Sequence, residues 1–255
     1  MNTRKPKAQI PRFQPMLELL MFKRPNAFGI ALAIFLILSV LGSPLYAATA
    51  DDPLEKMNRI THGFNRTLDC FIVKPLAVNY QRFTPGIIRS GVHNFFSNLD
   101  DVQVTFNDLM QFKFSQATAD FSRFALNSTV GVGGLINVAG PVFELPKHQQ
   151  DFGKTLAGWG VKSGPYLVLP FFGPSTLRDG FAVGVDALVD PVPAVDHVKS
   201  RNGLIAGKTT DYRAAVLGFD DLVVGDDYLF IRGIYLQHRE YQISGDAVNV
   251  AFEEF

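Results

Sequence analysis

From residue 52 onward, apolar residues recur mostly every three or four positions, which is the spacing of amphipathic helices. We predict a first helix over 52–69, because Asp52 is a good N-cap residue and Pro53 suits the first helical position. Pro85 separates it from further helices. The same pattern predicts these further helices over 86–99, 101–112 and 116–130.

The middle of the chain has a different residue pattern. Residues 131–141 are rich in glycine, which breaks helices and predicts a loop with a short element. Asp151 begins another predicted helix. The segment 158–174 is apolar, interrupted by glycine and bounded by proline, and it predicts a core strand or a hairpin that inserts into lipid or a partner.

Helical spacing returns in the last third of the chain. Ser175 is a predicted N-cap of a helix that ends before Asp190 and Pro191. A polar helix over 202–217 and a final amphipathic helix from Asp226 complete the predicted set. The paired acids in this sequence, such as Asp100 with Asp101, are interpreted as solvated caps at helix starts.

The first 50 residues have the features of a targeting segment. Six basic residues precede or flank an apolar run over 27–41, and small residues follow up to Ala50. This order predicts a cleavable signal peptide over 1–50, with Met21 as an alternative start. A membrane anchor is the alternative, but the run is shorter than the roughly 20 apolar residues of a spanning helix. Residues 245–255 form a C-terminal tail.

Charge and cysteine content narrow the functional classes. Of 24 basic and 24 acidic residues, six basic and one acidic lie in 1–50, which leaves 18 against 23 and a net charge of −5. This balance offers no basic patch and argues against nucleic-acid binding. Cys70 is the only cysteine, so an internal disulfide is impossible, and we expect a buried or partner-facing thiol.

No constellation of catalytic or metal-binding residues emerges, and we predict no cofactor. The five histidines are scattered without an i,i+3 or i,i+4 pair, which argues against a local metal site. Ser175 lacks the second glycine of a nucleophile elbow. The chain does hold 23 phenylalanines. They would form the core of a water-soluble protein, or the lipid-facing surface of helices that lie in a membrane interface.

Several motifs in order resemble the MlaA (VacJ) family. They begin with Asp-Pro-Leu-Glu at 52–55, followed by Asn58 and Arg59, and end with a long glycine- and proline-rich signature. The matching segments lie at 52–59, 64–69, 73–77, 91–99, 123–134, 151–156 and 159–179, so the resemblance covers about 51–244.

The resemblance implies a mostly α, single domain over 51–244, with amphipathic helices arranged as a ring or disc and a glycine-rich hairpin. It implies a non-enzymatic outer-membrane protein at the periplasmic face, which passes mislocalised phospholipid through an amphipathic channel and so maintains lipid asymmetry. The implied partners are phospholipid, a trimeric porin and a periplasmic, MlaC-like lipid carrier.

The resemblance also implies roles for individual residues. The glycine-rich hairpin at 160–170 matches the segment thought to gate the channel, and Phe64 with Asn65 matches an element of channel control. The gating residues are Gly160, Val161, Lys162, Gly164, Pro165 and Tyr166. One departure concerns the anchor: no lipobox cysteine ends the signal segment, so we expect no lipid anchor. A porin-bound structural protein, or a lipid acyl hydrolase that uses Ser175, remains the alternative.

Overall fold

The computed structural model describes residues 52–244. All of these residues belong to one compact unit. The predicted signal peptide and the C-terminal tail therefore lie outside the described residues.

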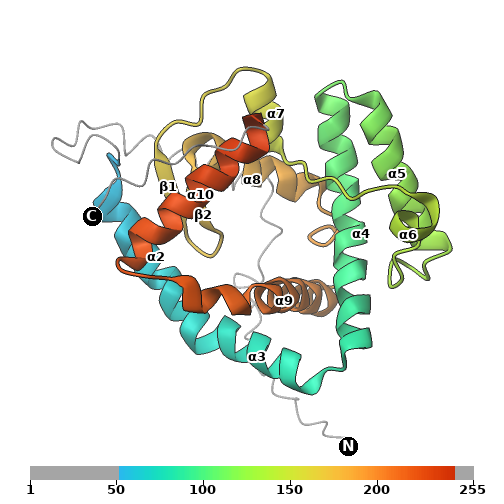
Figure 1. Cartoon of the computed structure of the whole chain (residues 1–255), viewed down its shortest axis with the longest axis horizontal. Coiled ribbons are helices and arrows are strands. Elements are labelled where there is room, and N and C mark those ends of the chain that lie inside the picture. Colours follow the sequence, from blue (N-terminus) through green and yellow to red (C-terminus); the bar gives the residue numbers. More distant parts are fainter. Residues whose placement is uncertain (1–51, 245–255) are drawn as a thin grey trace, which may run out of the picture. The chain divides into compact units, whose positions relative to one another are not determined.

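The first helical stretch is longer than the sequence predicts. Helix α2 (Glu55–Leu68) continues through a π-helical turn, η1 (Asp69–Val73), into α3 (Lys74–Phe83) (Figure 1). Pro75 lies just after this turn. In a regular helix its ring would clash with the carbonyl of Phe71, and the wider π turn relieves that clash.

The start of this stretch differs from the prediction. Asp52 is not the N-cap, because the helix begins after Leu54. The Asp52 carboxylate accepts a hydrogen bond from the Leu54 backbone N–H (3.2 Å) and another from the Tyr228 hydroxyl, far along the chain. Asp52 thus connects the start of α2 to Tyr228 in the last helix of the described chain.

The two helices predicted over 86–99 and 101–112 are one helix, α4 (Gly86–Met110). The prediction that Asp100 and Asp101 cap a helix is wrong, because both lie in its interior and pair with distant cations. The ammonium group of Lys147 binds Asp101, and that of Lys208 binds Asp100 (2.7 Å). The sequence pattern alone places these two carboxylates at a helix end. Ion pairs with residues far along the chain stabilise them inside the helix.

The next three helices agree with their predictions. Helix α5 (Phe114–Thr129) packs on α4, and the short α6 (Ala139–Phe143) follows the glycine-rich turns. Helix α7 (Phe152–Gly158) begins at its predicted N-cap, where the Asp151 carboxylate accepts a hydrogen bond from the Lys154 backbone N–H (2.9 Å).

The apolar segment after α7 forms the predicted hairpin. Strands β1 (Tyr166–Leu169) and β2 (Gly173–Thr176) pair antiparallel, with Tyr166 opposite Thr176. Helix α8 (Leu177–Val189) follows at once. Its N-cap is Thr176, whose hydroxyl accepts from the Asp179 N–H (3.2 Å), and not Ser175 as predicted.

The elements pack in a closed circuit within this unit. Helix α3 packs on α9 (Val198–Ala215), α9 on α4, and α4 on α7 and α8. Helix α8 packs on the hairpin, and β1 packs on α2, which returns to α3 through η1 (Figure 1). A 3₁₀ turn, η2 (Leu217–Leu222), leads from α9 to the last helix, α10 (Asp227–Ser244), which packs on α7 and β2.

The distribution of polar and apolar side chains is inverted relative to a soluble protein. Among residues 52–244, 12 apolar or aromatic side chains are buried, against 15 polar or charged ones. Phe96 is the only buried phenylalanine in this part of the chain, whereas Phe71 is 80% exposed and Phe83 73%. The interpretation of the phenylalanines as a soluble core is therefore wrong. Soluble monomers seldom expose so much apolar surface, whereas proteins in contact with lipid do.

Candidate functional site

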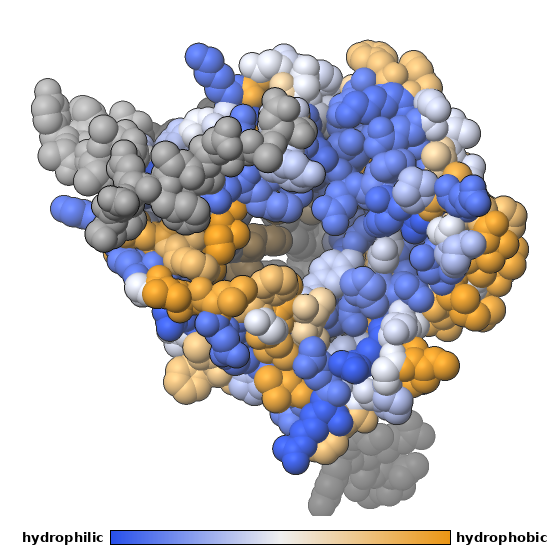
Figure 2. Space-filling view, in the orientation of Figure 1, coloured by the Kyte–Doolittle hydropathy of each residue, from blue (hydrophilic) through white to orange (hydrophobic). Residues whose placement is uncertain are grey.

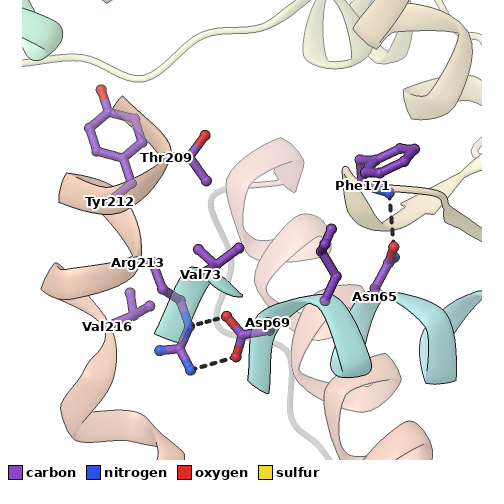
Figure 3. A pocket seen from close by; sticks show the side chains of 9 residues that line it. Asn65, Asp69, Val73, Phe171, Thr209, Tyr212, Arg213 and Val216 are labelled. Carbon is purple, nitrogen blue, oxygen red and sulfur yellow. Dashed lines mark hydrogen bonds and ion pairs between the residues drawn. The ribbon is translucent and has the colours of Figure 1, made fainter. Parts of the chain in front are cut away.

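A cavity of about 320 Å³ lies between α2, η1, α9 and the turn of the hairpin (Figure 3). Such a volume is at the lower end of typical ligand pockets, which are roughly 300–1,000 Å³. The lining combines apolar and polar side chains, which suits an amphipathic ligand: Asn65, Leu68, Asp69, Val73, Phe171, Thr209, Tyr212, Arg213 and Val216.

The cationic side chain of this cavity is Arg213. Its guanidinium donates two hydrogen bonds to the Asp69 carboxylate (2.8 and 2.9 Å), as Figure 3 shows, and two more to Asp220 (both 2.9 Å). Lys74 contacts Asp220 as well (2.7 Å). The hydrogen bond to Asp69 raises the pKa of Arg213 further, so its charge is permanent. Arg213 Nη1 has no hydrogen-bond partner among the described residues.

The π-helical turn brings Asp69 to this position. Its extra residue per turn shifts the helix face between α2 and α3, and the i→i+5 bond from the Lys74 N–H to the Asp69 carbonyl closes it. Such turns are rare and often occur at functional sites. Tyr212 lies one residue before Arg213 and donates its hydroxyl hydrogen to Asp100. Burial, followed by the field of Asp100, raises the pKa of Tyr212, so it remains a neutral donor.

Helix α2 binds the free edge of β1 through two asparagines seven residues apart. Asn58 donates to the Tyr166 carbonyl (3.0 Å) and accepts from the Val168 N–H (2.9 Å). Asn65 repeats the arrangement three residues further along, at the end of β1 and the following turn. It donates to the Leu169 carbonyl (2.9 Å) and accepts from the Phe171 N–H (2.8 Å). The two carboxamides thus bond backbone groups at this edge, as a third strand would.

The structure therefore joins the predicted residues Phe64 and Asn65 to the hairpin. The Phe64 ring meets the Phe171 ring edge-on, with centroids 5.2 Å apart, while Asn65 lines the cavity. Asn65 holds the turn at the point where Phe171 contributes to the cavity wall. Phe171 and its neighbour Phe172 are both 71% exposed.

The predicted gating segment comprises a loop and the first strand of the hairpin. Residues 160–165 form a loop that leads into the hairpin, and the hairpin itself spans 166–176. In this loop Gly160 and Gly164 have positive φ angles (85° and 69°), a conformation that favours glycine. Val161 and Lys162 are exposed, whereas the Pro165 carbonyl accepts from the Leu177 N–H (3.0 Å).

None of the six residues predicted to gate the channel lines the cavity. Tyr166 is buried and packs against Tyr228 and Tyr235, with ring centroids 6.0 and 6.1 Å apart. Only the far turn of the hairpin, at Phe171, reaches the cavity wall.

Sequence reasoning missed the side chains that close the cavity from α9. Thr209, Tyr212 and Arg213 come from a helix about 140 residues after α2, and their polar stretch has no motif that marks a site. The one available signal was Asp69, which belongs to a matched motif and which Arg213 binds.

Other candidate residues have ordinary environments. Ser175 is buried in β2 and donates its hydroxyl hydrogen to the adjacent Thr176 carbonyl (3.2 Å), an arrangement that does not activate a nucleophile. The Cys70 thiol is exposed in this chain, not buried. Within residues 52–244 no group of three or more His, Cys, Asp or Glu residues could hold a metal ion.

Apolar side chains gather on the outside of the unit. Figure 2 shows such a patch at the right edge, where α5, α6 and the turns between them lie. Its exposed members are Val130, Val132, Leu135, Ile136, Val142 and Phe143. A second group follows the α2–α3 stretch and the start of α4: Ile60, Phe71, Ile72, Phe83, Ile87 and Ile88. In the described part of the chain, no helix is both long and apolar enough to cross a membrane.

Comparison with known proteins agrees with this architecture. The chain is 35% identical over 228 residues to the intermembrane phospholipid transport system lipoprotein MlaA of Shigella flexneri, and 34% identical to that of Escherichia coli K12. Each alignment covers 85% of this chain and 88% of the relative. An uncharacterised protein of Rickettsia felis is 37% identical over 196 residues, with coverage of 75% and 78%.

A solved structure from work on the structural basis for maintenance of bacterial outer membrane lipid asymmetry superposes with a TM-score of 0.65 at 33% identity. The match covers 75% of this chain and 98% of the other. The sequence profile of the MlaA lipoprotein family matches residues 50–242, which is most of the chain. The chain therefore belongs to the MlaA lipoprotein family.

Proposed function

We propose that this protein is a non-enzymatic conduit that removes mislocalised phospholipid from the outer leaflet of the outer membrane. The observation that carries the proposal is the amphipathic cavity inside the circuit of helices. Its apolar lining, such as Val73 and Val216, suits acyl chains. The Nη1 of Arg213, unpartnered among the described residues, offers a hydrogen-bond donor to a polar headgroup, while Asp69 and Asp220 compensate the charge of Arg213. Relatives named for intermembrane phospholipid transport support the same ligand class.

The inverted surface supports a position in the periplasmic leaflet of the outer membrane. Apolar side chains on the outside gain free energy in the acyl region, at roughly 25 cal/mol per Å² removed from water. Polar side chains that line the cavity, such as Asn65 and Thr209, offer a headgroup contacts away from hydrocarbon. In the proposed route a trimeric porin holds the protein by its apolar outer surface, and an MlaC-like carrier receives the lipid.

The hairpin is the proposed moving part. Its turn contributes Phe171 to the cavity, and the asparagine contacts from α2 set the position of that turn. The loop over 160–165 contains two glycines with positive φ, so it can act as the hinge of the hairpin. In this proposal the gating residues named above move the turn and do not themselves contact lipid.

The test is the amount of phospholipid exposed in the outer leaflet of cells that lack the gene, measured by susceptibility to an external phospholipase. We expect a rise that the intact gene reverses. Val73→Trp, which fills the cavity, should fail to reverse it, whereas Val78→Trp, on an exposed part of α3, should succeed. Immunoblots must show equal amounts of both variants. Full complementation by Val73→Trp would contradict a conduit and favour a porin-bound scaffold, which needs no cavity.

The hydrolase alternative is tested in the same cells. Ser175→Ala removes the only candidate nucleophile and should restore lipid asymmetry fully, because the Ser175 hydroxyl donates to the adjacent Thr176 carbonyl and not to a general base. Loss of complementation with normal protein abundance would support the enzyme.

A further inference from the structure

A second cavity, of about 510 Å³, shares no lining residue with the first. It lies where the end of α4 and the start of α5 meet α7 and the last turn of α10. Two lysines and three apolar side chains give it a mixed character: Lys113, Lys154, Phe112, Trp159 and Ile243. The function proposed above does not use this cavity.

The two lysines lack anionic partners. No carboxylate among the described residues forms an ion pair with Lys113 or Lys154, and the Lys154 ammonium group donates to the neutral Gln149 carbonyl (2.6 Å). The nearest acid of α7, Asp151, is bound by Arg239 (2.6 Å). Burial lowers the pKa of Lys154; the charge of Asp151 opposes this shift, whereas Arg239 and Lys113 add to it. An anion between the two ammonium groups would offset the burial and the repulsion between the lysines.

The rest of the wall combines three glutamines, Gln111, Gln150 and Gln242, with accessible apolar side chains. Phe112 is 75% exposed and ends α4 in a left-handed conformation (φ 59°), which is uncommon for an aromatic residue. Trp159 is half exposed; its indole N–H donates to the Met110 carbonyl (3.2 Å), and its ring makes a T-shaped contact with Phe152 (centroids 5.8 Å apart), which leaves the exposed part of the ring for a ligand. An amphiphile with a negatively charged head could thus satisfy the lysines and cover the aromatic rings together.

We propose that this second cavity binds the phosphate headgroup of an anionic phospholipid, with Lys113 and Lys154 on the phosphate and Phe112, Trp159 and Ile243 against the start of the acyl chains. The choice of phospholipid among phosphate-bearing ligands rests on the proposed function. The volume lies within the range of ligand pockets and is larger than the first cavity.

Trp159 makes the proposal directly testable, because it is the only tryptophan in the chain. Dihexanoyl phosphatidylglycerol is titrated into the full chain in a non-ionic detergent, and the tryptophan emission is followed. We expect a saturable blue shift as acyl chains replace water on the ring. Lys113→Gln and Lys154→Gln should each weaken the apparent affinity about five- to tenfold, which is within the range for one lost hydrogen bond at a solvent-accessible site. Lys113 is exposed, so Lys113→Gln should disturb folding less than Lys154→Gln.

The controls separate a lipid site from general attraction of anions. Lys199→Gln, in the exposed first turn of α9, removes the same charge outside the cavity and should leave the titration unchanged. Inorganic phosphate at matched ionic strength should bind at least tenfold more weakly, and dihexanoyl phosphatidylcholine should also bind more weakly. The proposal is overturned if the phosphatidylglycerol titration does not saturate. Equal weakening by Lys199→Gln, or equal affinity for phosphate alone, would overturn it as well.

These outcomes are independent of the first cavity. A failed titration leaves the cell assay with Val73→Trp unaffected, and failure of that assay leaves the Trp159 titration to be judged on its own.

Discussion

The packing of α2 against β1 allows one prediction to be worked out in detail. Asn58 and Asn65 each make one donor and one acceptor bond to the β1 backbone or the residues after it, yet their surroundings differ. Asn58 is fully buried, whereas the turn that Asn65 holds is exposed at Phe171. The variants Asn58→Ala and Asn65→Ala therefore remove the same two backbone contacts in different environments, and Asn58→Ala also removes a long hydrogen bond to Asp52 (3.3 Å).

The two variants should differ in their effect on the free energy of unfolding. Each lost hydrogen bond contributes about 1 kcal/mol. For Asn58→Ala the Val168 N–H and the Tyr166 carbonyl stay buried and unsatisfied, which raises the cost of each lost bond to about 1–3 kcal/mol. We expect a loss of about 3–5 kcal/mol for Asn58→Ala. For Asn65→Ala water can replace the amide at the exposed turn, so the expected loss is about 1–2 kcal/mol.

The measurement is denaturant unfolding of the purified protein in detergent, followed by circular dichroism. Asn79→Ala is the matched control, because that side chain donates only to the Pro75 carbonyl within the exposed face of α3 (2.9 Å), and its loss should be below about 0.5 kcal/mol. Equal losses for Asn58→Ala and Asn65→Ala would refute the argument from burial. A loss for Asn58→Ala no greater than that of Asn79→Ala would refute the role of α2 as a substitute strand.

Three further predictions concern packing, protonation and exposure. A Cβ at Gly153 would lie 2.3 Å from the Arg239 guanidinium, so Gly153→Ala should destabilise the fold by about 2–4 kcal/mol in the same unfolding assay. Gly158→Ala in the same helix has no neighbour within 4 Å and should be neutral or mildly stabilising; equal stability of the two variants would contradict the packing argument. Burial, and then a hydrogen bond to Asp120, raises the pKa of Asp108 from 3.8 to about 7, so the folded state holds a proton that the unfolded state releases. Stability should therefore fall as the pH rises from about 4 to 7. Asp108→Asn should match the wild type near pH 4 and exceed it near pH 8 by about 2 kcal/mol, and an unchanged pH profile would exclude this group. The Cys70 thiol lies beside the exposed Phe71, so in intact membranes it should react with a lipid-soluble maleimide and not with a charged one; rapid labelling by the charged reagent would place this face in water.

Local residue chemistry was sufficient to place several element boundaries. Pro85 begins α4 because it cannot extend the preceding helix, and Asp151 caps α7 because its carboxylate accepts a free N–H of the first turn. The apolar, glycine-interrupted segment formed the hairpin as predicted. These features depend on neighbours within a few positions. The sequence could therefore specify them, together with the family motifs.

Errors arose where a distant partner overrides a local preference. Asp101 has the character of a helix cap, but it lies inside α4 because Lys147 and Arg123 approach it from other elements. The cavity is a similar case. Asp69 and Arg213 are 144 positions apart, and only the circuit of helices brings them together.

The direction in which each amphipathic helix faces was also undetermined by the sequence. Helical periodicity defines an apolar and a polar face, and it is the same whether the apolar face packs into a core or points to lipid. The tertiary structure decided this, because the circuit of packed elements turns Asn58, Asp101 and Arg213 inward and leaves Phe71 and Phe83 outside. Helix positions thus followed from short-range chemistry, whereas the polar interior and its cavity required packing between residues far apart in the chain.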